Sequence, residues 1–256
     1  MVETDPIGVY VAAFLARCDH LRGPGQARMR RPGVHGLLSV PDDPYIRLLV
    51  TDDRARDTLV EILPNTSAGV INVFAAAERC SELVAARRAW RPDPATAMSC
   101  GDLRAVPALP LPRDLRLHSV RRVPGDPADG VQLEDAIAAA IRAAPGISDP
   151  PHVFADYLRS LPASFRLFAA VDRDGAVRAT SASGTFGTEA TVIFVNTDPE
   201  WRRRGIGQAM TAAALRAAHD SGARRAGLDA SDAGARIYMR LGFETVTRTT
   251  RFFHTH

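Results

Sequence analysis

The sequence contains no lysine, few cysteines and no long hydrophobic run. All 32 basic residues are therefore arginine, which we attribute to a G+C-rich coding sequence, so a single arginine carries little information. Cys18, Cys80 and Cys100 form no C-x-x-C pair, which supports neither a disulfide framework nor a zinc site. The most apolar early stretch, residues 7–16, is too short to span a bilayer and follows acidic residues. These absences predict a cytoplasmic protein without a bound metal or a membrane partner.

Aromatic residues make up 6% of the chain, charged residues 24% and hydrophobic residues 46%, a composition typical of a folded protein and unlike collagen or a disordered chain. The length of 256 residues is enough for two modest domains. Residues 1–114 carry 14 Arg and 14 acidic residues, whereas residues 115–256 carry 18 Arg and 15 acidic residues. The net charge of +3 thus lies in the second half, where an anionic ligand is expected.

The basic cluster at residues 28–31 has no interleaved aromatic residue, which predicts a solvated loop and no nucleic-acid partner.

The first half alternates between predicted strands and predicted helices, a pattern that indicates an α/β layer. Strands are expected at residues 45–51 and 69–74, and helices at 52–63 and 75–90.

Prolines recur from Pro92 to Pro112, around one short strand expected near residues 98–100, and favour an extended connection. We place the domain boundary there, which gives domains at residues 1–112 and 113–256.

The second half predicts the order strand, two helices, three strands, helix, strand, helix and strand. The signals are a period near two at residues 115–123, a hairpin pattern with an Asp-Gly corner at residues 174–175, and apolar stripes of period 3.6 in the helices. The expected strands are residues 115–123, 165–172, 176–183, 189–196, 224–229 and 243–253, and the expected helices begin at 131, 149, 205 and 233.

Residues 192–207, VIFVNTDPEWRRRGIG, carry the clearest chemical signal. An apolar strand leads through an arginine-rich turn onto the start of an amphipathic helix. The first N–H groups of a helix lack internal partners and its macrodipole is positive there, so a diphosphate can bind. Gly205 and Gly207 leave room for close approach, and Arg202 to Arg204 add positive charge. A tight turn with solvated arginines is the structural alternative, and these residues alone do not decide between the two.

The wider context resembles the GCN5-related N-acetyltransferase (GNAT) superfamily over about residues 115–253. The family signature R-x-x-G-x-G/A matches at Arg202, Gly205 and Gly207. The downstream pattern A-x-x-x-Y-x-x-x-G-F is close, with Ala235 one place nearer Tyr238 and with Leu-Gly-Phe at residues 241–243. The resemblance implies an α/β class with a mixed sheet: a GNAT fold in the C-terminal half and a smaller, degenerate GNAT-like domain in the N-terminal half.

In that family acetyl-coenzyme A (acetyl-CoA) lies between the fourth and fifth strands, the pantetheine pairs with the fourth strand, and the diphosphate lies on backbone amides at the helix start. A tyrosine near the end of the fourth helix often protonates the departing thiolate, and a phenol suits that role. Here that residue is Tyr238, although its ring could instead only pack beside the cofactor. The cofactor-binding residues implied are Ile193, Phe194, Val195, Arg202, Arg203, Arg204, Gly205, Ile206, Gly207 and Gln208.

Two features leave the mechanism open. Many family members carry Asn where this chain has Asp232, and an acidic group near an anionic cofactor is unfavourable unless it is turned away or paired with Arg236. A general base has no motif of its own: Glu189, Asp156 and Tyr157 are candidates by position, and each also suits a surface role.

The first half resembles the degenerate N-terminal halves of two-domain acetyltransferases and lacks R-x-x-G-x-G. It is expected to shape the acceptor site or a dimer surface, so a homodimer stays open, and to bind no second cofactor. The function implied is direct transfer of acetyl from acetyl-CoA to a primary amine of a small molecule or peptide. The alternatives are a CoA-binding regulatory or interaction module without transfer activity, and transfer of a different acyl group.

Overall fold

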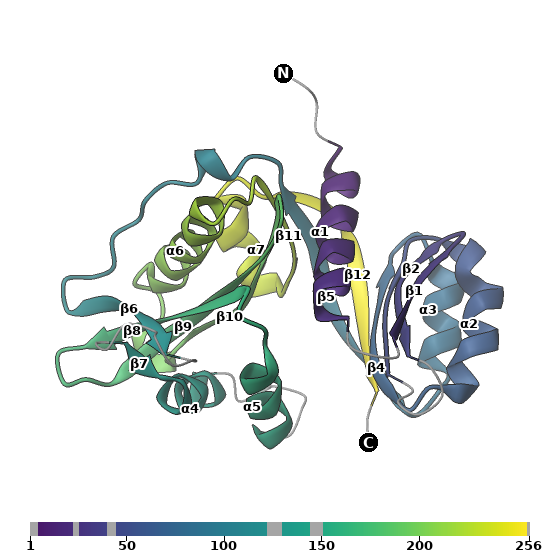
Figure 1. Ribbon diagram of the computed structural model, residues 1–256, viewed down its shortest axis with the longest axis horizontal. Helices are drawn as coiled ribbons and strands as arrows, with labels where there is room; N and C mark the ends of the chain where they lie inside the picture. The colour runs from purple at the N-terminus through teal and green to yellow at the C-terminus, as the bar shows by residue number, and fades with distance from the viewer. Residues whose placement is uncertain (1–4, 23–25, 40–44, 122–129, 144–150, 255–256) are drawn as a thin grey trace. The chain divides into compact units, whose positions relative to one another are not determined.

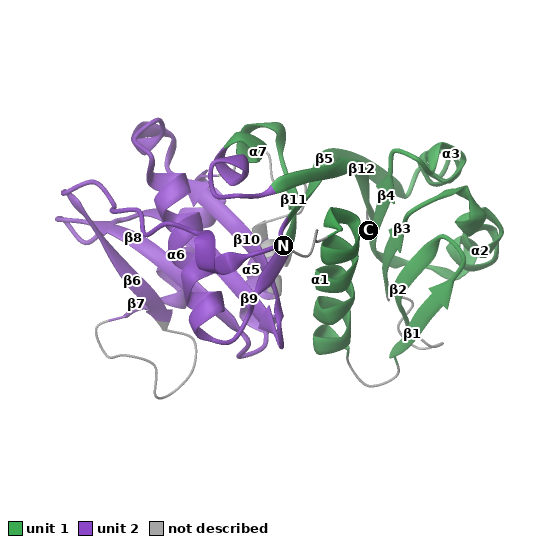
Figure 2. Ribbon diagram, turned by 90° about the horizontal axis from the view of Figure 1, so that it is seen from above, with its two compact units in different colours: residues 1–99, 227–236, 244–256 green, residues 100–226, 237–243 purple. Residues whose placement is uncertain are grey.

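A computed structural model describes residues 5–22, 26–39, 45–121, 130–143 and 151–254 (Figure 1). The chain forms two compact units (Figure 2). Unit 1 comprises residues 1–99, 227–236 and 244–256, and unit 2 comprises residues 100–226 and 237–243. A single boundary at residues 112–113 is therefore too simple, because the last strand of the second half is part of unit 1. Among the described residues, no helix combines the length and apolarity needed to cross a membrane.

Unit 1 is a mixed sheet with helices on both faces (Figure 1). Its strands lie in the order β1-β2-β3-β4-β12-β5, antiparallel except for the parallel pair β3 and β4. The core includes Ile46 and Leu48 from β3, Ile71 from β4 and Phe252 from β12, all at most 1% exposed. The elements are α1 (Pro6–Leu21), β1 (Gln26–Arg31), β2 (Val34–Ser39), β3 (Tyr45–Val50), η1 (Asp53–Ala55), α2 (Arg56–Ile62), η2 (Leu63–Asn65), β4 (Ala68–Phe74), α3 (Glu78–Ala85), β5 (Trp90–Cys100) and β12 (Glu244–His254).

Three local expectations for the first half differ from the structure. Residues 28–31 lie in the edge strand β1 and not in a loop. The segment from Trp90 to Cys100 is one long strand despite Pro92 and Pro94. Because these prolines are two residues apart, their nitrogens, which carry no hydrogen, face the same edge of β5. The ladder with β12 can then use the backbone groups of the residues that alternate with them, such as Asp93. The expected helix at 75–90 is correspondingly shorter, because α3 ends at Ala85.

Unit 2 has the strand order β11-β10-β9-β8-β6-β7, with α6 on one face and α4 and α5 on the other (Figure 1). The element order expected from the sequence is confirmed except for the short strand β7, which occupies residues 131–132 where the first helix was expected to begin. The strand β8 has the predicted bounds. The elements are η3 (Leu103–Ala105), β6 (Leu115–Arg121), β7 (Val131–Gln132), α4 (Leu133–Ala143), α5 (Pro151–Ser160), β8 (Phe165–Asp172), β9 (Val177–Phe186), β10 (Glu189–Thr197), η4 (Pro199–Trp201), α6 (Ile206–Asp220), β11 (Arg225–Ala230) and α7 (Asp232–Met239). The last two are divided between the units, since residues 227–236 belong to unit 1.

The two halves of the chain repeat one topology. In the first half, two antiparallel pairs (β1–β2 and β2–β3) are followed by α2, the parallel strand β4, α3 and β5. In the second half, β8, β9 and β10 are followed by α6, the parallel strand β11, α7 and β12. The last strand of the second repeat then lies between β4 and β5 of the first. The mixed α/β class is thereby confirmed, and the N-terminal half repeats the topology of the C-terminal half.

Candidate functional site

The strand β10 has an open edge over most of its length. It pairs with β9 from Glu189 to Thr197 except at Phe194 and Val195. Its parallel ladder with β11 has only two pairs among the described residues, Glu189–Arg225 and Ala190–Ala226. Glu189 to Val192 are buried, and the strand becomes partly exposed from Ile193 to Thr197. The second part of β10 therefore offers backbone donors and acceptors to an extended ligand.

A β-bulge interrupts β10 within this open part. The register with β9 shifts between Ile193, which faces Ala182, and Asn196, which faces Thr180. Phe194 has a φ of 55°, a left-handed conformation that is unusual for a bulky residue. Its carbonyl oxygen accepts a hydrogen bond from Thr180 Oγ1 at 3.2 Å. The structure thus places the predicted residues Ile193, Phe194 and Val195 at and around the bulge.

The helix α6 begins without a side-chain cap. Its N-cap is Gly205, whose φ of 77° favours glycine, and among the described residues no side chain caps the first turn. The first turn also contains no acidic residue. Its N–H groups and the positive end of the macrodipole are therefore available to an anion. Ile206, Gly207 and Gln208 form this first turn, as the sequence predicted.

Gly207 lies where three elements of unit 2 meet. A Cβ added there would lie 3.6 Å from Thr197 Oγ1 at the end of β10 and 3.4 Å from Ile237 Cδ1 on α7. The next residue on α7 is Tyr238. The fold therefore brings the open end of β10, the start of α6 and the helix of the predicted acid together.

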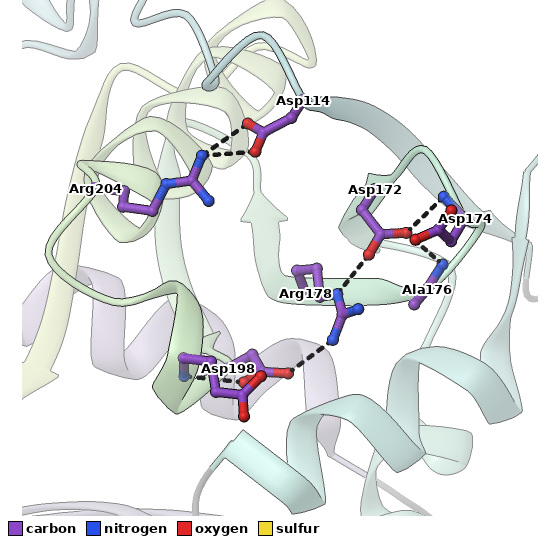
Figure 3. Close-up of polar contacts among 8 residues, drawn as sticks. Asp114, Asp172, Asp174, Ala176, Arg178, Asp198 and Arg204 are labelled. Carbon is purple, nitrogen blue, oxygen red and sulfur yellow. Dashed lines mark hydrogen bonds and ion pairs between the residues drawn. The ribbon is translucent and has the colours of Figure 1, made fainter.

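Two of the three predicted arginines have protein partners through their side chains. Arg202 donates to the carbonyl oxygens of Thr197, at 3.1 Å, and Ala143, at 2.7 Å. Arg204 pairs with Asp114 at 2.7 Å (Figure 3). This hydrogen bond lowers the pKa of Asp114 below its ordinary value. Both arginines thus hold the turn in place, and their backbone amides are the groups left for a ligand.

Arg203 differs from its two neighbours. It is exposed, has a φ of 65° and has no hydrogen-bond or ion-pair partner within the described part of the chain. Of the three arginines, it is the one whose side chain is available to an anion beside the first turn of α6.

A second ion-pair network supports the turn between β10 and α6. Arg178 on β9 donates to Asp172 at 2.7 Å and to Asp198 at 3.4 Å (Figure 3). Asp198 in turn caps η4 by accepting a hydrogen bond from the Glu200 N–H. The hydrogen bond from Arg178 is the main cause that lowers the pKa of Asp172. The Trp201 ring makes cation–π contacts with both Arg178 and Arg204. Their guanidinium carbons lie 5.2 and 4.5 Å from the ring centre.

Tyr238 is 8% exposed near the end of α7. Its ring centre lies 5.8 Å from that of Phe243, and its carbonyl oxygen accepts hydrogen bonds from the N–H groups of Leu241 and Phe243. The Leu-Gly-Phe turn thus fixes the position of Tyr238. This arrangement suits both a proton donor and a ring that packs beside a ligand.

The general-base candidates are either engaged or outside the described side chains. Glu189 is buried and paired with Arg225. Asp156 is exposed and paired with Arg159 at 2.8 Å. The side chain of Tyr157 lies outside the described residues.

Asp232 is paired with Arg248 at 2.7 Å and not with Arg236, and its side chain is 78% exposed. This pairing partly neutralises an acidic group that would otherwise oppose an anionic cofactor. In the described part of the chain, no group of three or more His, Cys, Asp or Glu residues could hold a metal ion.

Four residues that the sequence analysis did not name support the site: Thr180, Arg178, Trp201 and Asp114. Thr180 and Arg178 lie on a strand that carries no motif, and Asp114 lies 90 residues before Arg204. Only Trp201 had a signal, because it is a large aromatic residue directly before the arginine cluster.

The comparisons with known proteins agree with this geometry. Residues 163–245 match the acetyltransferase (GNAT) domain family. No curated protein matches the sequence at a significant level. Among solved structures, a GCN5-related N-acetyltransferase from Kribbella flavida superposes with a TM-score of 0.63 at 19% identity, over 96% of both chains. A tandem GNAT protein from the clavulanic acid biosynthesis pathway gives a TM-score of 0.52 at 17% identity, over 98% of this chain and 95% of that one.

These structural likenesses extend over nearly the whole chain. Because the sequence identities are only 19% and 17%, they show the fold alone. The family match shows the kind of chemistry. Residues 163–245 of this protein are a GNAT acetyltransferase domain, and the chain is an acyltransferase with the fold of GNAT proteins.

Proposed function

We propose that this protein is an N-acetyltransferase that transfers acetyl from acetyl-CoA directly to a primary amine of a small molecule or peptide. One observation carries the proposal: the open edge of β10 leads into the uncapped start of α6 within one unit. An extended pantetheine can pair with the strand while its diphosphate accepts hydrogen bonds from the helix. The residues present fit this ligand, because Gly205 and Gly207 leave the helix start unobstructed and Arg203 adds an available positive charge.

The chemistry requires few protein groups. The amine nitrogen attacks the thioester carbonyl carbon, the carbonyl oxygen becomes an oxyanion, and the C–S bond then breaks. The Tyr238 hydroxyl gives its proton to the departing thiolate and regains one from solvent. The amine loses its extra proton to a base or to relayed water. No covalent enzyme intermediate is needed in this scheme.

A CoA-binding regulatory or interaction module is the second candidate. The observation in its favour is that Glu189 and Asp156 both have arginine partners, so neither is a free base. A thiol-release assay with acetyl-CoA separates the two candidates. Amino acids, polyamines, aminoglycosides and short peptides are tested as acceptors, with reactions lacking an amine as the control. Amine-dependent release of CoA is the expected result. Binding of acetyl-CoA without release in the presence of any of these amines would support the module.

We expect one acetyl-CoA site per chain, in unit 2. The strands of unit 1 that correspond to β10 and β11 are β3 and β4, and they pair without a gap from Tyr45–Ala68 to Val50–Val73. The helix that corresponds to α6 is α2, which continues directly from η1. Asp52 caps η1 by accepting a hydrogen bond from the Arg54 N–H, and the acidic Asp57 lies in the first turn of α2. Hydrogen bonds from Arg54 lower the pKa of Asp52 to about 2, so the carboxylate is charged and this capping ion pair occupies the helix start.

Isothermal titration calorimetry checks this expectation as a stoichiometry of one acetyl-CoA per chain. The Gly207→Asp variant provides the control, since it should leave no binding if unit 2 holds the site. Two equivalent sites in the wild type would contradict the expectation.

A further inference from the structure

Phe194 is held in a conformation that its own side chain disfavours. A positive φ is uncommon for a bulky residue and persists only where the surrounding structure imposes it. The bulge takes Phe194 and Val195 out of the regular ladder between β9 and β10. Something other than the ladder must therefore fix the peptide groups at this point of the strand.

Thr180 provides that constraint from the neighbouring strand. Its hydroxyl donates to the Phe194 carbonyl oxygen at 3.2 Å, and the residue is 6% exposed. Thr180 and Phe194 also line one small apolar cavity together with Ala136, Ile137 and Ala140 of α4. A carbonyl that loses its partner in such surroundings is not readily satisfied by water, so the bulge depends on this hydroxyl.

We propose that Thr180 is a positioning residue for acyl transfer, because it fixes the bulge of β10 against which the thioester lies. This inference rests on the proposed function, in which acetyl-CoA pairs with residues 193–195. As the amine attacks, charge develops on the thioester oxygen, and backbone N–H groups stabilise that charge only when they are already in position. Thr180 itself gains and loses no proton. Its effect is on the position of the bulge.

The variant Thr180→Val removes the hydroxyl and keeps the shape, because a methyl group takes the place of the hydroxyl beside the Phe194 carbonyl oxygen. We expect kcat to fall by about 10- to 100-fold, because small displacements at a reacting centre cost up to about 100-fold in rate. We expect the dissociation constant of acetyl-CoA to change by less than about 3-fold, since pantetheine pairing and the diphosphate site are retained. Thr180→Ser should restore most of the lost kcat.

Ser181→Ala is the matched control. Ser181 is the next residue on β9, is 1% exposed, and donates to the carbonyl oxygen of Met210 on α6 at 3.1 Å. This variant also loses one buried hydroxyl bonded to a backbone carbonyl, but on the other face of the sheet. It should lower thermal stability and leave kcat unchanged.

Hydrogen–deuterium exchange of the unliganded protein gives a readout that does not depend on activity. Amide exchange in residues 192–197 should be faster in Thr180→Val than in the wild type, and unchanged in Ser181→Ala. If Thr180→Val does not fold, Thr180→Ala undergoes the same two measurements.

The outcomes separate this inference from the proposed function. A wild type that transfers acetyl to no amine contradicts the proposed function, while the exchange experiment still tests whether Thr180 holds the bulge. An active wild type whose Thr180→Val variant keeps its kcat, or keeps slow exchange in residues 192–197, overturns the role of Thr180. Equal losses of kcat in Thr180→Val and Ser181→Ala also overturn it, because a general loss of packing would then explain both.

Discussion

Tyr238→Phe lowers kcat by about 10- to 1000-fold and leaves the dissociation constant of acetyl-CoA nearly unchanged. This result is expected because the phenol would act on the thiolate that forms as the C–S bond breaks and would contribute little to the bound ground state. The ring, which is 8% exposed and packs near Phe243, stays in place when only the hydroxyl is removed. Steady-state kinetics with the acceptor from the amine screen measures kcat, and calorimetry measures cofactor binding.

Tyr10→Phe is the control for this substitution. Tyr10 is 2% exposed in α1, and its hydroxyl donates to Asp229 Oδ1 at 2.7 Å. The same chemical change there should cost about 1–3 kcal/mol of stability, because a buried acceptor loses a partner, and kcat should not fall. Unchanged turnover in Tyr238→Phe would contradict the acid role and favour packing of the ring beside the cofactor.

Gly207→Asp abolishes the stabilisation of the protein by acetyl-CoA. The new Cβ would make ordinary contacts, at 3.4 Å to Ile237 Cδ1 and 3.6 Å to Thr197 Oγ1, so the fold can accommodate it. The carboxylate beyond it would lie in the first turn of α6, where the diphosphate is expected, and like charges repel there. A carboxylate at a helix start also favours the macrodipole by about 0.3–1 kcal/mol. The variant should therefore melt near the wild-type temperature.

Thermal unfolding with and without acetyl-CoA measures this effect. At a ligand concentration about 100 times the dissociation constant, linkage stabilises the wild type by about 2.7 kcal/mol. For a chain of this size, that is a rise in melting temperature of about 5–10 °C. Gly207→Ala, which adds the Cβ without the charge, should retain most of the rise. A full rise in Gly207→Asp would mean that the diphosphate binds elsewhere and would remove the main support for the proposed site.

The sequence predicted the local features of unit 2 well, because its signals are local. The apolar run from Phe165 to Asp172 ends at an Asp-Gly turn, and the arginine and glycine residues before α6 lie within one short segment. The uncapped helix start and the position of Tyr238 on α7 follow from such segments. The sequence could not show which arginines have protein partners, because Asp114 and Ala143 lie 90 and 59 residues from the arginines that they bind.

Pairing between distant strands was the main feature that sequence reasoning missed. The ladder of β5 with β12 joins Trp90 to His254, and no local pattern in either segment indicates the partner. The prolines of β5 favoured an extended connection between domains. A strand is compatible with them only if their nitrogens face away from the hydrogen-bonded partner, and the sequence does not show which edge is hydrogen-bonded. The bulge at Phe194 was likewise invisible, since its cause lies on β9.

The position of β12 has a consequence for how the chain folds during its synthesis. The strands β4 and β5 leave the ribosome long before β12, which follows the whole of residues 100–226 and still belongs between them. Until β12 arrives, both strands lack a neighbour on that side, and the core of unit 1 lacks Phe252. The N-terminal half therefore cannot complete its fold first, as domains usually do. The sheet of unit 1 is therefore completed only when β12 has been made. Until then, the unpaired edges of β4 and β5 can form hydrogen bonds with other chains.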